Sequence, residues 1–324
     1  MKERSKRRQQ ERLTKIKRII KISLTASIVL FLAVFFAFVP FRLLLPAYKI
    51  AKRGEGELRL HFLDLNGGVT IVEFPDGEAL VVNAGDGLFS SDNTLCRYLR
   101  ALDPTSVSVV ATSNASSHVG GMPALFEVFP IKAAYLPALS SDTGSYNRFL
   151  TAVQKEGCEA VRLARYGVIE NSSGAYAVCL SPYSNEKEGV TPEESSTMLY
   201  LSYAGVSAVL AGDVTQKREN QLVNEYSLSS TIFDSGQYQV RLEETKILGV
   251  SSHGSDSGSG ENFLSLLNPS ASVVCCNRTQ HPSSNTLKRL AQYSEKIYRT
   301  DELGAVMITI KDGDFEVSSG VLKK

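Results

Sequence analysis

The chain has 324 residues, of which 43% are hydrophobic and 21% charged, and its formal net charge is +1. These proportions are ordinary for a globular protein. The charge is uneven, because residues 1–21 carry ten Lys or Arg and two acidic residues, which leaves about −7 on the remainder. A main domain with that balance lacks the clustered positive charge that a large nucleic-acid-binding surface requires.

The N-terminal region contains an uncharged apolar stretch, 22–39 (ISLTASIVLFLAVFFAFV). As a helix it would rise about 27 Å, close to the hydrocarbon core of a bilayer at about 30 Å. The basic residues before it predict a cytoplasmic N-terminus and an extracytoplasmic chain after about residue 45. A cleaved signal peptide is the alternative, but the apolar run is long and no clear cleavage site follows it.

These features predict four segments and a single-pass protein of the cell membrane. They are a basic cytoplasmic segment at 1–21, a transmembrane helix at 22–45, a linker at 46–57 and an extracytoplasmic domain at 58–324.

The first half of the expected domain begins with short strands and continues with alternating helices and strands. Apolar runs separated by NGG and PDG turns predict three strands, at 58–65, 69–74 and 78–84. A helix at 91–102 follows, with Asp92 or Asn93 as its cap. The next expected elements are a buried strand at 106–112, a helix at 120–130, a strand at 131–137 and a helix at 145–157.

The second half repeats this mixture. The expected strands are 176–182, 197–205, 206–213, 271–277, 296–300, 305–310 and 314–319, and 245–255 is expected to be a strand that leads into a polar loop. The expected helices are 215–226, 260–269 and 283–293. Many hairpins mixed with helices favour a layered α/β fold with much antiparallel pairing over a doubly wound parallel sheet. The five cysteines lack metal-type spacing, and we expect buried free thiols.

Polar loops follow several of the expected strands, and three of the four histidines fall in such loops. The four are His61, His118, His253 and His281. A zinc hydrolase site needs several histidine and aspartate ligands from different loops, with one position open for water.

The order of these segments resembles the metallo-β-lactamase fold, and specifically the soluble hydrolase domain of competence DNA-uptake (ComEC-type) proteins and their stand-alone relatives. HFLDLNGGVTIVEFPDGEALVVNAGD is similar to the opening of that family, and TSNASSHVGGMPALFEVFPIKAAYLP to its T-H-x-H-x-D-H-x-G-G motif. LSYAGVSAVLAGD, ILGVSSHGS, HPSSNTLKRL and YRTDELGAV resemble its later motifs. The resemblance runs from about Leu58 to Val317 and implies an αββα fold, a two-sheet sandwich with outer helices.

The resemblance also implies a depleted metal site. Five positions depart from the family motifs: Asn83, Ser113, Ala115, Ser117 and Ser252. Four candidates persist: His118, Asp213, His253 and His281. Alanine supplies no ligand, and neutral Ser and Asn are poor substitutes for imidazole and carboxylate toward zinc. We therefore expect no metal, or at most one zinc or manganese ion held by His118, Asp213 and His253.

Each retained residue also has a purely structural interpretation. His118 could cap or pack against a helix, and Asp213 could cap the helix that follows it. His253 could be a hydrogen-bonding loop residue, and His281, before Pro282, could be structural. The fourth histidine, His61, is expected to be a packed core or surface residue of a strand. Serines near His118 could suggest a serine nucleophile, but no G-x-S-x-G elbow supports one.

Two functions follow from these alternatives. The first is a membrane-anchored, extracytoplasmic pseudoenzyme of the competence family, inactive or strongly impaired, that serves as a binding or assembly module. The second is a hydrolase with one metal ion that acts on a phosphoester such as DNA. The expected partners are the membrane and, outside it, a protein or a nucleic acid.

Overall fold

The computed structural model describes residues 2–38, 45–183, 191, 193–229, 231–276 and 282–321. The chain divides into two compact units, Met1–Pro46 and Ala47–Lys324. The expected division into four segments remains a prediction.

The first unit contains one long helix, α1 (Lys2–Phe38), which runs through both the basic and the apolar residues. Among the described residues, no helix has the length and apolar character needed to cross a membrane. This finding overturns the expected transmembrane helix and, with it, the expected single-pass location with a cytoplasmic N-terminus.

The second unit contains an eight-stranded mixed sheet, which we call sheet A. Its strand order is β15-β14-β1-β2-β3-β4-β5-β6, antiparallel from β15 to β3 and parallel from β3 to β6. The strands are β1 (Leu58–Phe62), β2 (Thr70–Glu73), β3 (Glu78–Val82), β4 (Ser106–Val110), β5 (Ile131–Leu136), β6 (Glu159–Arg162), β14 (Ala305–Lys311) and β15 (Asp314–Val321).

A second mixed sheet, sheet B, has seven strands in the order β13-β12-β11-β10-β9-β8-β7. Its strands are β7 (Val168–Glu170), β8 (Tyr176–Ser181), β9 (Met198–Tyr203), β10 (Val206–Leu210), β11 (Thr245–Gly249), β12 (Ala271–Val274) and β13 (Lys296–Arg299). The pairs from β10 to β13 are parallel and those from β7 to β10 antiparallel.

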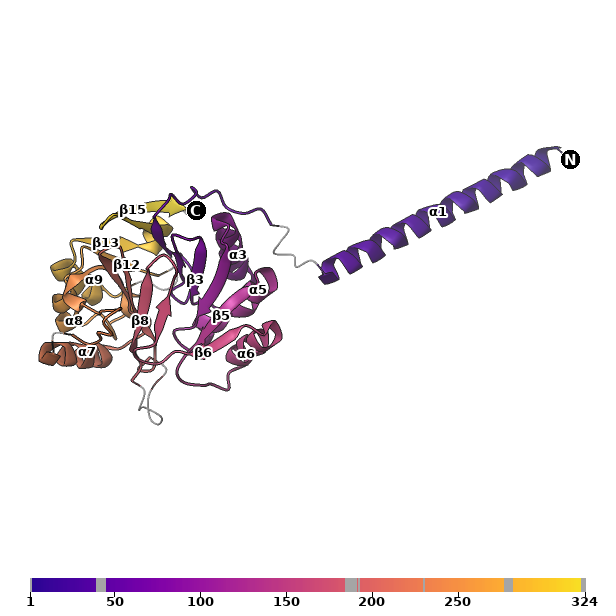
Figure 1. The fold of residues 1–324 in the computed structure, drawn as a ribbon. Helices are drawn as coiled ribbons and strands as arrows, with labels where there is room; N and C mark the ends of the chain where they lie inside the picture. Colours follow the sequence, from indigo (N-terminus) through magenta and orange to yellow (C-terminus); the bar gives the residue numbers. More distant parts are fainter. Residues whose placement is uncertain are drawn as a thin grey trace. The chain divides into compact units, whose positions relative to one another are not determined.

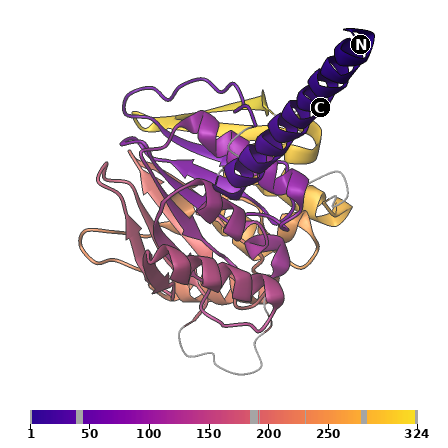
Figure 2. The same cartoon turned by 90° about the vertical axis from the view of Figure 1, so that its right-hand side faces the viewer.

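Helices cover the outer face of each sheet, as Figure 1 shows. On the side of sheet A are α3 (Phe89–Leu102), α4 (Ser116–Val119), α5 (Met122–Val128) and α6 (Gly144–Glu156). On the side of sheet B are α7 (Gln216–Ser229), α8 (Glu261–Leu267) and α9 (Ser284–Tyr293). The shorter elements are η1 (Leu242–Glu244), η2 (Ser251–Gly254) and α10 (Thr300–Leu303). The turned view in Figure 2 shows the helices of the first group in front of sheet A.

Alternation along the strands divides the core into three layers. In β3 and the neighbouring β4, Val81 and Val109 point toward the helices of sheet A, whereas Leu80 and Val110 point toward sheet B. A third cluster lies between sheet B and α7 to α9. The two mixed sheets with flanking helices form the expected αββα sandwich.

The structure differs from the expected elements at a few places. Helix α3 begins at Phe89 with Leu88 in the cap position, so Asp92 and Asn93 lie inside the helix and not at the expected N-cap. Strand β6 is mostly exposed and carries no apolar alternation, which is why the sequence gives no signal for it. All five cysteines are free thiols, four of them buried and Cys158 partly exposed.

Candidate metal centre

Three loops from two sheets meet at the carboxyl ends of neighbouring strands. His118 lies on α4, which follows β4 of sheet A. Asp213 follows β10 of sheet B, and His253 lies in η2, which follows β11 beside it. The N–H of Ala84 donates to the carbonyl of His118 at 2.8 Å, so the loop after β3 holds α4 in place.

The side chains of these three residues converge on one point. His118 Nε2 lies 3.0 Å from Asp213 Oδ2, and His253 Nε2 lies 3.6 Å from Asp213 Oδ1. One ligand atom from each residue falls within 4.8 Å of the other two. The imidazole centroids are 6.2 Å apart. Two imidazoles and one carboxylate are a ligand set suited to zinc, and they leave a position open.

Hydrogen bonds on the other nitrogen of each ring fix how the histidines face the cluster. His253 Nδ1 donates to the carbonyl of Cys275 at 2.9 Å, which leaves its Nε2 lone pair directed at Asp213. His118 Nδ1 lies 3.0 Å from the hydroxyl of Ser117. This hydroxyl can donate to the ring while Nε2–H bonds Asp213, and it can accept from the ring once Nε2 binds an ion.

The electrostatics of the cluster favour a charged Asp213 carboxylate and a neutral His253 imidazole. Burial by itself would raise the pKa of Asp213, but the attraction and hydrogen bond of His118, together with the attraction of His253, hold it below its usual range. Burial lowers the pKa of His253, although Asp213 and the Cys275 carbonyl act in the opposite direction. Deprotonated carboxylate and neutral imidazole are the forms that bind metal.

A cavity of about 40 Å³ lies beside the cluster, and its walls include Gly67, Gly68, Asn83 and Thr112. One water needs about 10–15 Å³, so the cavity has room for roughly three, or for an ion and a smaller number of waters. A Cβ on Gly68 would lie 3.1 Å from His253 Cε1, so the absence of a side chain lets this wall approach the ring.

The backbone at His253 is held in an uncommon conformation. Ser252 and His253 have φ values of 50° and 55°, and Gly254 follows with 78°. A non-glycine residue in this left-handed region costs on the order of 1–3 kcal/mol and persists only where surrounding contacts enforce it. The strain falls on the residue that completes the cluster.

The five replaced positions surround the cluster without supplying further metal ligands. The hydroxyl of Ser113 accepts from the N–H of Ala115 at 3.2 Å, and Ala115 caps α4 with no polar side chain. Ser117 contacts His118, as described above. Ser252 is buried, with its hydroxyl 3.4 Å from the carbonyl of Val214.

Asn83 is buried and uses both ends of its side chain. Its amide donates to the carbonyl of Gly67, while its oxygen accepts from the N–H and the hydroxyl of Thr112. Asn83 therefore organises the loops around the cavity as a neutral group.

Within the described part of the chain, the donor set fits one divalent ion and does not fit two. His118, Asp213 and His253 can ligate together, whereas Ser113 and Ala115 offer no imidazole. His281 lies outside the described residues. His61 is fully buried, between Tyr98 and Glu73, so its interpretation as a packed residue is confirmed.

The interpretation of Asp213 as a helix cap is wrong. Helix α7 begins three residues later, at Gln216, whose N–H donates to the carbonyl of Ser257. The N–H groups of Arg218 and Glu219 donate to the carbonyl of Thr215. With these groups paired elsewhere, the Asp213 carboxylate is directed at the two imidazoles. The hydrogen bond from His253 to the Cys275 carbonyl could not be predicted from the sequence, since any residue supplies a carbonyl.

This architecture, with its polar cluster at the edge where the sheets meet, is a metallo-β-lactamase-like fold. No protein-family model matches the chain. Among curated proteins, it is 24% identical over 215 residues to ComE operon protein 3 of Bacillus subtilis, a match that covers 65% of this chain and 26% of that protein. The chain thus matches about a quarter of the length of this relative.

Solved structures show the same architecture. A variant of the CmlA β-hydroxylase aligns with a TM-score of 0.50 at 9% identity, over 80% of this chain and 55% of that one. The metallo-β-lactamase fold protein YhfI of Bacillus subtilis aligns with a TM-score of 0.49 at 10% identity, over 81% of this chain and all of that one. At this level of identity the likeness concerns the fold alone.

Proposed function

We propose that the second unit is a competence-related domain that holds one divalent ion, zinc or manganese, and hydrolyses phosphoesters weakly or not at all. The convergence of His118, Asp213 and His253 within 4.8 Å carries the proposal of one ion. The hydrogen bonds at Nδ1 of His118 and of His253 also favour one ion, because metal-binding histidines usually have their second nitrogen hydrogen-bonded.

The chemistry available to such a site is limited. A bound ion would polarise an oxygen of a phosphoester. Asp213 would supply negative charge, and the two histidines would supply neutral donors held by Ser117 and Cys275. Ser113 and Ala115 give no ligands for a second ion, so we infer that two-ion catalysis is lost. The similarity to a ComE operon protein supports a binding or assembly role toward DNA or a protein partner in DNA uptake.

Metal content is the measurement that tests this proposal. The full chain is loaded with Zn²⁺ or Mn²⁺, desalted and measured by elemental analysis, beside Asp213→Asn and the exposed control Asp142→Asn. We expect one ion per chain in the wild type and the control, and a loss of at least tenfold in Asp213→Asn. No bound ion, or two ions, in the wild type would refute the one-ion site.

Turnover of a phosphodiester such as bis(p-nitrophenyl) phosphate tests the impaired chemistry. We expect rates close to the buffer background with either metal. Robust turnover that His118→Ala abolishes would contradict impairment and establish the one-ion hydrolase instead.

A further inference from the structure

The loop that carries His253, residues 251–260 (SSHGSDSGSG), consists of small and polar residues apart from its histidine. We call it the His253 loop. Such a sequence supplies almost no apolar anchor of its own, and three glycines widen the range of its backbone conformations. Its shape therefore has to be imposed by side chains from neighbouring helices.

One buried carboxylate, Glu219 of α7, binds both ends of the His253 loop. It accepts from the hydroxyl of Ser251 at 2.7 Å, from the N–H of Ser259 at 2.8 Å and from the N–H of Gly260 at 2.7 Å. Glu219 has no exposed surface. Burial raises its pKa, although these three donors and Arg289 act in the opposite direction. A desolvated carboxylate with three donors is a specific arrangement, since an unpaired one would be strongly destabilising.

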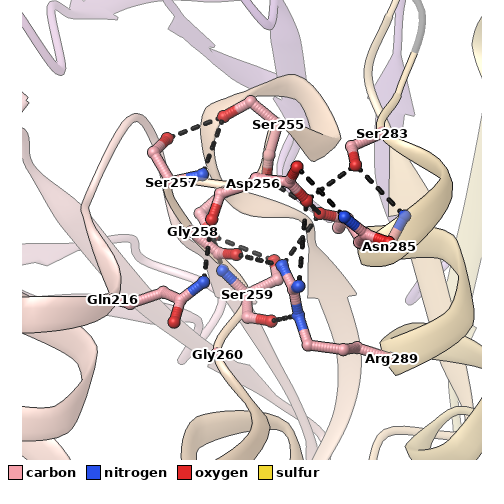
Figure 3. Close-up of polar contacts among 12 residues, drawn as sticks. Gln216, Ser255, Asp256, Ser257, Gly258, Ser259, Gly260, Ser283, Asn285 and Arg289 are labelled. Atoms are coloured by element: carbon pink, nitrogen blue, oxygen red, sulfur yellow. Dashed lines mark hydrogen bonds and ion pairs between the residues drawn. The ribbon is translucent and has the colours of Figure 1, made fainter.

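Arg289 of α9 also holds this end of the loop, as Figure 3 shows. Its Nε donates to the carbonyl of Ser259 at 2.9 Å, and its guanidinium also donates to the carbonyl of Gly258 at 3.1 Å. The N–H groups of the loop end thus face Glu219, while its carbonyls face Arg289.

Between these fastened ends lie Ser252 and His253 in their left-handed conformation. We propose that Glu219 is a positioning residue for the metal centre: by joining Ser251 to Ser259 and Gly260, it holds the strained backbone that directs His253 toward Asp213. This inference rests on the proposed one-ion site. Glu219 itself contacts neither Asp213 nor the imidazole in the described contacts, so it acts through the loop.

Glu219→Gln tests the proposal with little change of shape. A glutamine keeps one acceptor oxygen, so it cannot serve all three donors that the two carboxylate oxygens serve. We expect the affinity for Zn²⁺, measured against a chelating indicator, to fall about 10- to 100-fold. The absorption bands of the Co²⁺-loaded protein should also shift, which reports a changed ligand arrangement. The matched control is Glu225→Gln, on the same helix but paired with Arg165.

A second substitution separates positioning from general structural support. Glycine adopts positive φ readily, so Ser252→Gly should lower the strain that Glu219 opposes. The double variant Glu219→Gln/Ser252→Gly should regain most of the lost affinity and the wild-type Co²⁺ spectrum. Ala204→Gly, at a positive φ in the β9–β10 turn, should give no such rescue. Unchanged affinity in Glu219→Gln, or equal rescue by Ala204→Gly, would overturn the proposal.

Hydrogen exchange in the metal-free protein gives a readout that does not depend on metal binding. The amides of Ser259 and Gly260 should exchange at least tenfold faster in Glu219→Gln, with partial recovery on adding Ser252→Gly. If the wild type bound no ion but these amides behaved as expected, the one-ion function would fail while the loop restraint by Glu219 stood. Unchanged exchange at both amides would refute the restraint itself.

Discussion

The side-chain amide of Asn83 donates a hydrogen bond to the backbone carbonyl of Gly67 at 3.1 Å. The other end of the same side chain accepts two hydrogen bonds from Thr112, at 2.9 and 3.0 Å. The resemblance to the competence hydrolases implies an aspartate at this position. A carboxylate has no hydrogen to donate, so this contact belongs to asparagine and would become repulsive with aspartate.

Asn83→Asp should therefore destabilise the domain rather than restore a catalytic feature. Loss of the donor at a buried site, with an oxygen left facing the Gly67 carbonyl, should lower the free energy of unfolding by about 1–3 kcal/mol at neutral pH. Urea unfolding measures the change. Asn114→Asp, nearer the surface, is the control and should have a smaller effect. Equal stability of Asn83→Asp and the wild type would contradict this account.

Gly67 should tolerate no side chain. It has a φ of 89°, and a Cβ there would lie 1.7 Å from the backbone oxygen of Ser117, next to His118. Gly174 has a similar φ of 85° with nothing within 4 Å of an added Cβ, so it isolates the conformational part of the cost. We expect Gly174→Ala to cost about 1–2 kcal/mol and Gly67→Ala to cost clearly more. Equal melting temperatures for the two variants would show that the contact with α4 is unimportant.

The acid sensitivity of the fold should depend in part on His253. Its pKa is lowered by burial, so on acidification the unfolded chain takes up a proton before the folded one does. The contribution of this histidine is complete above the ordinary pKa of about 6.5 and is lost as the pH falls from there toward the folded value. Unfolding free energies between pH 5 and 8 should therefore decrease toward acid.

One variant tests how much of this slope belongs to His253. His253→Asn should flatten the profile, and the buried His61, whose pKa is also lowered by burial, should account for part of what remains. A wild-type profile that rises toward acid, or one unchanged in His253→Asn, would contradict the assignment.

Restoring the two histidines and the aspartate of the family motif at positions 113, 115 and 117 should raise the number of bound ions. The variant Ser113→His/Ala115→His/Ser117→Asp supplies two imidazoles and a carboxylate beside the retained cluster. If the scaffold keeps the family geometry, metal content should rise from one ion per chain to two. A variant of similar size that lacks the ligand atoms, Ser113→Phe/Ala115→Phe/Ser117→Asn, is the control. An unchanged stoichiometry would show that the loop no longer has the geometry for the second site.

Most of the sandwich could be predicted because its strands are buried and alternate strictly. Leu58, Leu60 and Phe62 of β1 face the space between the sheets, and the turns around β2 and β3 have clear Gly and Pro signals. Where side chains are exposed, the signal fails, as it does for Glu159–Arg162 of β6. The expected transmembrane helix was wrong, because no helix of the described residues is long and apolar enough to cross a membrane.

The candidate site was predictable in its members and not in its contacts. The resemblance to the metallo-β-lactamase fold, and not local spacing, implied that His118, Asp213 and His253 would meet, as they do. The alternative role of Asp213 as a helix cap could not be rejected from the sequence, because local sequence does not show that Ser257 and Thr215 accept from the first turn of α7. The burial of Glu219 and its contacts with the His253 loop could not be predicted either, since a glutamate in a helix of polar residues is usually solvated.

The origin of the three ligands has a consequence for folding thermodynamics. His118 comes from the half of the domain built on sheet A, and Asp213 and His253 come from the half built on sheet B. An ion that binds only when these halves are docked adds its binding free energy to the stability of the whole sandwich. At a free concentration one hundred times the dissociation constant, this linkage amounts to about 2.7 kcal/mol. Metal supply could thus set the lifetime of the domain against proteolysis, whether or not any substrate is ever turned over.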